Sequence, residues 1–384
     1  MRPVSVVGIG QVPVRKQHSE SLRQLGAAVV RLAMEDAGLG DIDALYLANM
    51  LGDELQGQKH LAALVADEAG LSGIEALELR AATASGAAAL RAGFLAVSSG
   101  AAEHVVVAGV EKMNAPGVTP ALAKALDAER EVPDGATLVS ENARLMDRYL
   151  REFRLPDDVL APFAVNAHHN ANNNPLAMFK TELTTSDVMT SRVISGPIRL
   201  YDCAPISEGA AAVVLAPSSE AHSLCEQPVT LAASAVATDR FRIANRPQPL
   251  QLMAARLSAQ RAFSQAGTTP ETINFFEAHD AFTIMTCLLL EAAGFAAPGE
   301  GWKLAAEGEI ALGGRLPLST MGGLKARGHP IGATALYQVC EIVLQLTGRA
   351  GENQLNSPRM AMMQSVGGAA VTVITHLFAA GAAS

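Results

Sequence analysis

The chain has 384 residues, of which 49% are hydrophobic and 17% are charged, so it can bury a large core and is not a disordered chain. Its formal net charge of -9 argues against a nucleic-acid or anionic-membrane surface, and we expect neither partner. Four widely spaced cysteines form no C-x-x-C pair, which predicts no zinc site and no disulfide framework. A reducing compartment, the cytoplasm, follows as the expected location.

The two ends of the sequence differ from the usual targeting and membrane segments. The N-terminus has no basic region followed by a long apolar run, so we expect no signal peptide. Residues 366–384 carry no Asp, Glu, Lys or Arg, which makes a membrane helix an alternative there. The Gly367-Gly368 pair and the β-branched run at 371–374 instead favour a buried strand.

The first half begins with a strand, a helix and a second strand. Residues 4–7 open the first strand, residues 21–37 follow as an amphipathic helix that Gly38 ends, and residues 42–47 form the next strand. The expected apolar face of the helix consists of Leu22, Leu25, Val29 and Leu32.

The same order of elements returns in the second half. Residues 229–231 open a strand, residues 250–266 are typical of a helix that Gly267 ends, and residues 273–277 form the matching strand. This recurrence indicates an internal duplication.

A second pair of segments strengthens the duplication. A helix start rich in small residues begins at Thr83, and a similar one begins at His329. Aligning the glycines three residues further on, Gly86 and Gly332, places Thr83 opposite His329. Late in each half, a Gly-Ala-Ala triplet precedes a β-branched strand.

We therefore predict two copies of one β/α unit, residues 1–219 and residues 220–384. The first copy contains an insertion at about 111–200 that is rich in Pro, Asn and charged residues. Long excursions of this kind commonly cover a substrate.

Candidate catalytic residues follow from packing the two copies around a pseudo-two-fold axis. Thr83 and His329 would then meet, each at the positive end of a helix dipole, where an oxyanion or a thiolate is stabilised. His279 directly follows the strand at 273–277 and adds a polar group that is costly to bury. Alone, each histidine reads equally well as a capping or hydrogen-bonding residue; together they are candidates for catalysis.

The sequence gives weaker support for candidate ligand-binding residues than for the candidate catalytic residues. Gly322, Gly323 and Lys325 form a loop that leads into His329, although an ordinary tight turn explains the glycines as well. Arg240 and Arg242 follow the first strand of the second half and could meet phosphates, while a solvated loop is the default interpretation.

Three motifs resemble the thiolase superfamily, in particular the sterol-carrier-protein type and the related archaeal thiolases. They are the Gly-His-Pro signature at 322–333, the His-Asp-Ala-Phe motif at 277–282 and the Ser-Glu-Gly-Ala-Ala stretch at 207–211. The resemblance covers essentially the whole chain and implies a five-layer αβαβα sandwich, with two similar halves and a loop domain over the coenzyme A site. It also implies an acyl-CoA thioester as substrate, no bound cofactor or metal, and a homodimer or homotetramer.

The chain departs from the family pattern at the nucleophile. The family has Cys-x-Ser-Gly where this chain has Thr83-Ala84-Ser85-Gly86, and expected polar residues are replaced by Ser319, Met321 and Ser365. A threonine hydroxyl is far less acidic than a thiol with a pKa of about 8.5, so covalent thiolysis by Thr83 is disfavoured.

Three functions follow from the resemblance and its departures. The first is a thiolase-like acyltransferase that makes or breaks C–C bonds next to a CoA thioester, with altered chemistry. The second is a cysteine-independent retro-aldolase, and the third is a non-catalytic acyl-CoA-binding subunit completed by an OB-fold/zinc-ribbon partner. A Rossmann dehydrogenase is rejected because the segment at 8–13 lacks the third glycine and has a proline at the helix start.

Overall fold

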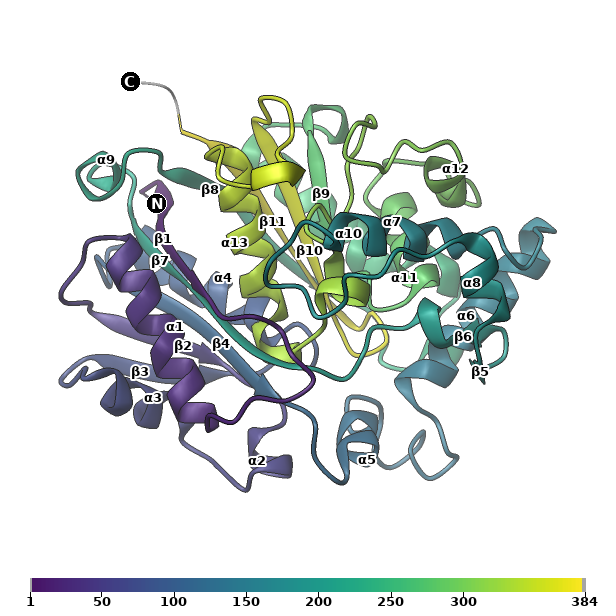
Figure 1. Cartoon of the computed structure of the whole chain (residues 1–384), viewed down its shortest axis with the longest axis horizontal. Coiled ribbons are helices and arrows are strands. Elements are labelled where there is room, and N and C mark those ends of the chain that lie inside the picture. Colours follow the sequence, from purple (N-terminus) through teal and green to yellow (C-terminus); the bar gives the residue numbers. More distant parts are fainter. Residues whose placement is uncertain (1, 382–384) are drawn as a thin grey trace.

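A nine-stranded sheet runs through the whole of the computed structural model, which describes residues 2–381 (Figure 1). The strands are β1 (Val4–Gln11), β2 (Ala44–Ala48), β3 (Glu75–Leu79), β4 (Val105–Lys112), β7 (Glu208–Pro217), β8 (Val229–Thr238), β9 (Phe275–Ala278), β10 (Met360–Gly367) and β11 (Thr372–Ala380). Their spatial order is β3-β2-β4-β7-β1-β8-β11-β10-β9. A separate hairpin consists of β5 (Val193–Ser195) and β6 (Ile198–Arg199).

The strand order has an internal symmetry about the central pair, β1 and β8. Outward from this pair the order is β1-β7-β4-β2 on one side and β8-β11-β10-β9 on the other. The two strands pair antiparallel at Ser5 with Thr230 and at Val6 with Val229. Beyond β9, Leu318 forms an isolated bridge to Phe276, in the place that β3 takes in the first half. The internal repeat is thus present as two similar half-sheets, while the boundary between residues 219 and 220 stays a prediction.

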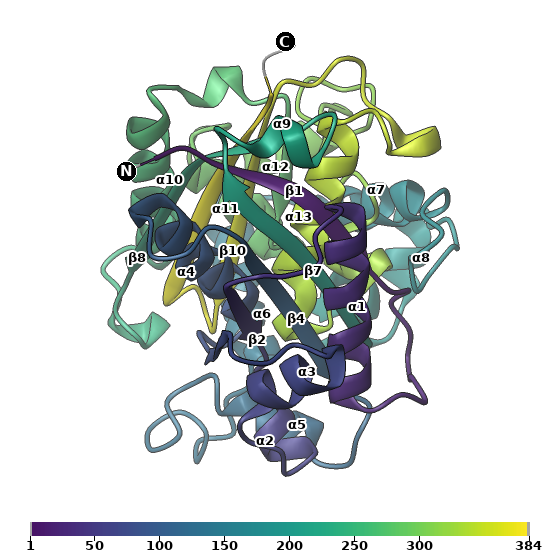
Figure 2. The same cartoon turned by 90° about the vertical axis from the view of Figure 1, so that its left-hand side faces the viewer.

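Helices cover the half-sheets on both faces. The helices are α1 (Leu22–Asp36), α2 (Gly52–Leu55), α3 (Leu61–Ala69), α4 (Ser85–Ser99), α5 (Val118–Ala123), α6 (Leu138–Phe153), α7 (Ala161–Ala171), α8 (Thr185–Thr190), α9 (Ala221–Leu224), α10 (Met253–Ala266), α11 (Thr283–Ala292), α12 (Gly301–Ala306) and α13 (Thr334–Leu346). Helices α4 and α13 pack between the half-sheets, α1 covers the outer face of the first and α10 that of the second (Figures 1 and 2). This is the expected five-layer αβαβα order.

The first helix shows how the local sequence specifies an element. Ser21 caps α1 in a capping box with Gln24, and the chain leaves the helix through Gly38, whose φ is +63°. The predicted apolar face is confirmed except at Leu32, which is 41% exposed. Ala33, one position further on, takes the buried place, so the stripe turns away from Leu32.

Two predicted helix starts lie later in the chain than expected. The helix predicted at 250–266 begins at Met253, because Pro249–Gln251 form a 3-10 turn and Leu252 takes a left-handed φ of 40°. The helix predicted from Thr83 begins at Ser85. The segment 366–384 contains the predicted buried strand β11, and no helix among the described residues is long and apolar enough to cross a membrane.

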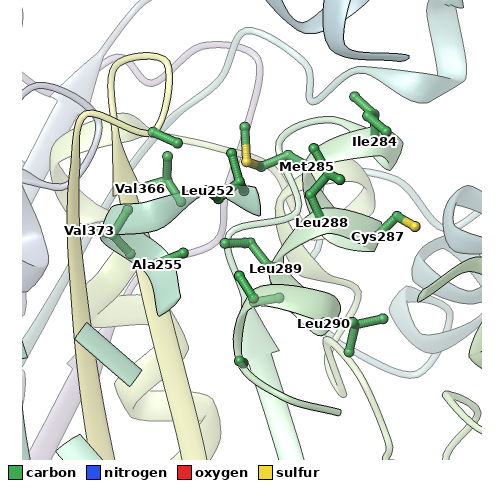
Figure 3. Close-up of a cluster of buried hydrophobic side chains, with 14 of the residues drawn as sticks. Leu252, Ala255, Ile284, Met285, Cys287, Leu288, Leu289, Leu290, Val366 and Val373 are labelled. Atoms are coloured by element: carbon green, nitrogen blue, oxygen red, sulfur yellow. The ribbon is translucent and has the colours of Figure 1, made fainter. Parts of the chain in front are cut away.

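The largest hydrophobic core lies over the second half-sheet, where α10 packs on β10 and β11 and α11 packs on α10, and it also includes residues of the insertion, such as Leu145 and Tyr149 on α6 (Figure 3). Leu252 and Leu289 belong to it, and so do Met285 and Val366, which also reach the cavity described below. A second core surrounds α4 and α13 and joins the two half-sheets.

The starts of α4 and α13 approach each other through glycines. A Cβ atom added at Gly86 would lie 2.8 Å from the Gly332 carbonyl oxygen, and one added at Gly109 would lie 2.7 Å from the Ala333 Cα atom. The two residues that the duplication aligned, Gly86 and Gly332, are therefore in contact, and backbone atoms close the space around them.

Gly109→Ala should lower the free energy of unfolding by about 1–3 kcal/mol, since the new methyl group meets backbone that cannot rotate away. The measurement is the midpoint of denaturant unfolding at unchanged slope. Gly40→Ala is the control, because nothing lies within 4 Å of a Cβ atom there. Equal midpoints for the two variants would contradict the close approach.

Candidate active site

A cavity of about 340 Å³ brings Thr83, His279 and His329 together. Thr83 lies just before α4, His279 follows β9, and His329 precedes a 3-10 turn, η6 (Ile331–Ala333). The remaining lining is mostly apolar, with Thr119, Thr137 and Asn142 as polar members, and its large apolar residues are Met113, Leu122, Leu138, Val139, Ile194, Leu200, Phe282, Met285 and Ile331. Many of these residues belong to the insertion at 111–200, which therefore forms one wall of the cavity.

One ring nitrogen of His329 is hydrogen-bonded, and the other has no hydrogen-bond partner in the part of the chain that the structure describes. Its Nδ1 lies 2.7 Å from Thr334 Oγ1, and this hydroxyl donates to the Pro330 carbonyl at 3.2 Å. Both contacts are satisfied together only if Nδ1–H donates to Thr334, because a hydroxyl has a single proton to donate. Nε2 of His329 then keeps its lone pair, which is the form of a base.

The second imidazole packs against the first. The ring centroids of His279 and His329 lie 5.1 Å apart, with the planes at 86°. Burial lowers the pKa of His279 to about 4, although Asp280 opposes the shift. Burial also lowers the pKa of His329 well below its ordinary value, and the neighbouring His279 adds to this. His279 Nδ1 has no partner among the described residues, so no protein group sets the tautomer of this ring.

The Thr83 hydroxyl is already engaged by backbone. It donates to the Val366 carbonyl at 2.5 Å and accepts from the Gly368 N–H at 3.1 Å. These contacts come from the end of β10 and the turn that follows. The hydroxyl proton therefore points to a carbonyl oxygen and not to a histidine, and no base activates Thr83 as a nucleophile.

The glycine loop, whose residues were predicted to contact the ligand, lies around Asp280, and contact of the loop with coenzyme A stays a prediction. The Lys325 ammonium is 1% exposed and lies 3.1 Å from Asp280 Oδ2 and 2.6 Å from its backbone oxygen. Gly323 has a φ of +54°, and a Cβ atom there would run into the Asp280 carboxylate. The loop thus wraps around Asp280, and Gly322, Gly323 and Lys325 do not line the cavity.

The predicted phosphate-binding arginines also lie outside the cavity lining. Arg240 is exposed and donates to the Asn245 carbonyl at 2.8 Å. Arg242 is half-buried, with Nε 4.0 Å from Glu131 Oε1. Contact of either residue with coenzyme A stays a prediction.

A buried carboxylate that the sequence analysis missed connects the loop after β2 to the turn that follows His329. Glu111, at the end of β4, accepts N–H groups from four positions, at distances of 2.9–3.1 Å: Asn49, Met50, Leu51 and Gly332. Burial raises its pKa to about 7, and the N–H donors oppose the shift. The signal was available, because Glu111 interrupts an apolar strand that is otherwise buried.

Glu111→Gln should destabilise the fold although it changes no volume. Each carboxylate oxygen accepts two N–H groups, so the amide NH₂ would face donors. We expect a loss of about 1–3 kcal/mol in the free energy of unfolding, seen as a lower denaturant midpoint. The substitution Glu352→Gln, at an exposed position, should leave the midpoint unchanged. A similar drop in the midpoint of Glu352→Gln would contradict a specific role of the N–H donors to Glu111.

The buried histidines should be neutral well below pH 6.5. NMR of ¹⁵N-labelled imidazoles should show His279 uncharged down to about pH 4. His329 should stay in its Nδ1–H form, because burial also lowers its pKa well below the ordinary value and Thr334 accepts this proton. Thr334→Val should abolish the single tautomer, while Thr334→Ser should keep it. A His279 signal that titrates near 6.5 would mean that the ring is solvated.

Comparison with known proteins gives the class. The N-terminal thiolase domain family matches residues 4–219, and the family described as thiolase C-terminal domain-like matches residues 235–380. The chain belongs to the thiolase family, and its similarity to sterol carrier protein 2 places it with the sterol-carrier-protein type.

Three relatives illustrate the similarity. An acetyl-CoA acetyltransferase of Methanothermobacter thermautotrophicus is 39% identical over 98% of this chain and 100% of its own. Sterol carrier protein 2 of Gallus gallus is 27% identical over 99% of this chain and 72% of its own. A solved structure described as the Ltp2-ChsH2(DUF35) aldolase has a TM-score of 0.86 and 24% identity, and the match covers 98% of each chain.

Proposed function

We propose that the chain acts on acyl-CoA thioesters by acid–base chemistry of His279 and His329, without a covalent acyl-enzyme. The reaction is aldol-type cleavage or formation of the bond between the α and β carbons next to the thioester. The observation that carries the proposal is the Thr83 hydroxyl, which two backbone groups hold while two neutral imidazoles face the same cavity.

The chemistry balances without a further reactant. In the cleavage direction, Nε2 of His329 takes the proton of the β-hydroxyl group, and the electron pair of the Cα–Cβ bond moves into the thioester enolate. A carbonyl product forms at the β carbon. His279, which no protein group fixes in one tautomer, donates an N–H to the enolate oxygen. The α carbon then receives the proton from His329, which restores the neutral base.

No other thiol replaces the absent cysteine in the cavity. Cys203 lines it, but burial raises the pKa of this thiol to about 12, so it carries no thiolate at neutral pH. Cys225, Cys287 and Cys340 do not line the cavity.

Acyl transfer is the second candidate, because a full-length relative at 39% identity is named an acetyl-CoA acetyltransferase. A binding subunit that needs a partner is the third. The neighbour named an aldolase has a DUF35 protein in its name, and its 24% identity establishes only the fold. An assay therefore has to include OB-fold/zinc-ribbon partner candidates.

A panel of CoA thioesters separates the candidates. We expect β-hydroxyacyl-CoA to be cleaved to a carbonyl compound and a shorter acyl-CoA, with no need for free coenzyme A. Thiolysis of β-ketoacyl-CoA that depends on added coenzyme A would support acyl transfer instead. Binding without turnover, with and without a partner, would support the binding subunit.

Variants of the three cavity residues test the roles. Thr83→Ala should keep turnover within about ten-fold of the wild type, whereas His329→Gln and His279→Gln should each lose about 10²–10⁴-fold. Thr83→Ser is the matched control, since it keeps both backbone contacts. Because thiols take no part, alkylation of the cysteines should leave turnover largely intact. Loss of all activity in Thr83→Ala, with Thr83→Ser active, would make the hydroxyl a nucleophile.

A further inference from the structure

Three charged side chains are buried together outside the cavity. Glu277 on β9 and Arg327 in the π-helical segment η5 (Gly323–Arg327) are 0% exposed, and Glu341 on α13 is 2% exposed. Arg327 Nε lies 3.4 Å from Glu341 Oε1, and the guanidinium carbon lies 5.0 Å from the centre of the Tyr337 ring. No step of the mechanism above uses this cluster.

The charges of the cluster do not balance if every group is ionised. One guanidinium would face two carboxylates, which leaves a net negative charge in a dry interior. The next cation, Lys325, is already paired with Asp280. The other ionisable groups on α13, Tyr337 and Cys340, bring no positive charge, and β10 places Met363 opposite Glu277. A proton on one carboxyl group removes the imbalance.

The hydrogen bonds indicate which carboxyl group takes the proton. Glu341 forms an ion pair with Arg327 at 3.4 Å, although neither of its oxygens has a hydrogen-bond partner among the described residues and burial raises its pKa to about 7. Glu277 accepts from the Thr320 N–H at 2.8 Å and from its hydroxyl at 2.7 Å, both through Oε1, whereas Oε2 has no partner among the described residues. Glu277, in contrast to Glu341, forms no ion pair among the described residues, so it is the carboxyl group that takes the proton, on the oxygen that accepts no hydrogen bond. Burial and the neighbouring Glu341 also raise the pKa of Glu277 well above its ordinary value.

We propose that Glu277 is protonated at neutral pH and that the neutral Glu277–Arg327–Glu341 cluster positions the two histidines. Glu277 lies two residues before His279, and Arg327 lies two residues before His329. Glu341 is on α13, whose first residue, Thr334, sets the tautomer of His329. Loss of the proton leaves an unbalanced charge between the elements that carry the site. The consequence for activity rests on the proposed function; the protonation itself does not.

Protonation of Glu277 makes stability depend on pH in a defined direction. The folded chain holds a proton that the unfolded chain releases above the ordinary glutamate pKa of 4.5. The contribution of this group to the free energy of unfolding therefore falls as pH rises from 4.5 towards the folded pKa. Between these two pKa values the folded chain binds one more proton than the unfolded chain, and the slope of the free energy of unfolding against pH measures this difference.

Two measurements on the full chain test the protonation. The infrared difference spectrum between the wild type and Glu277→Gln at pH 7 should show the carbonyl band of one buried carboxylic acid, because the contribution of Glu111, whose pKa is raised to about 7, is common to both proteins and cancels. Between pH 5 and pH 7, the slopes of stability against pH of the wild type and Glu277→Gln should differ by one proton. The exposed Glu129→Gln is the control and should keep both wild-type features. Glu341→Gln should have a lower melting temperature than Glu277→Gln, because it removes the direct partner of Arg327.

A difference spectrum without this band overturns the proposal, and so does a wild-type spectrum without any acid band, whether or not any variant folds. The reverse order of melting temperatures would place the proton on Glu341. For activity, the decline of kcat/KM at alkaline pH should be absent in Glu277→Gln; an unchanged decline would limit the cluster to stability. If no CoA thioester turns over, the proposed function fails, while the infrared and linkage results still decide the protonation.

Discussion

The contact between the starts of α4 and α13 is the constraint on which the site depends. Each helix start belongs to a different half of the chain, and they meet where Gly86, Gly109 and Gly332 leave no room for a side chain. The Glu111 carboxylate locks the same place, because it accepts the Gly332 N–H together with donors from the loop after β2. The position of His329 relative to Thr83 therefore follows from backbone packing and does not rest on flexible side chains.

Burial supplies the chemistry of the two imidazoles. In a cavity with apolar walls, both histidines lose the solvation that stabilises their charged forms, and the pKa of each falls. Full charges are kept out of the cavity lining, in the Asp280–Lys325 pair and in the cluster around Arg327. These charges fix the elements that carry the histidines while the rings themselves remain neutral and available for proton transfer.

The sequence predicted those site residues whose positions are determined by the duplicated fold of the backbone. The duplication placed Thr83 opposite His329, and the structure brings both to one cavity with His279, because equivalent residues of two similar halves meet near their axis. Side-chain partners were not predictable in the same way. Lys325 could be assigned to a ligand or to Asp280 only after the path of η5 was known. Likewise, Leu32 fits the apolar periodicity of the sequence, and only the packing of α1 shows that Leu32 lies outside the buried face of the helix.

The hydrogen bonds of Thr83 show what this residue does in the cavity, where the resemblance predicts a nucleophilic cysteine. If the cavity had only lost a reactive group, the remaining hydroxyl would be free to turn towards either histidine. It is instead built into the turn between β10 and β11, where it donates to Val366 and accepts from Gly368. A hydroxyl suits this double contact because it donates and accepts at once, and a thiol does both only weakly. Thr83 therefore stabilises the cavity wall, and in the proposed mechanism the histidine pair carries the proton chemistry.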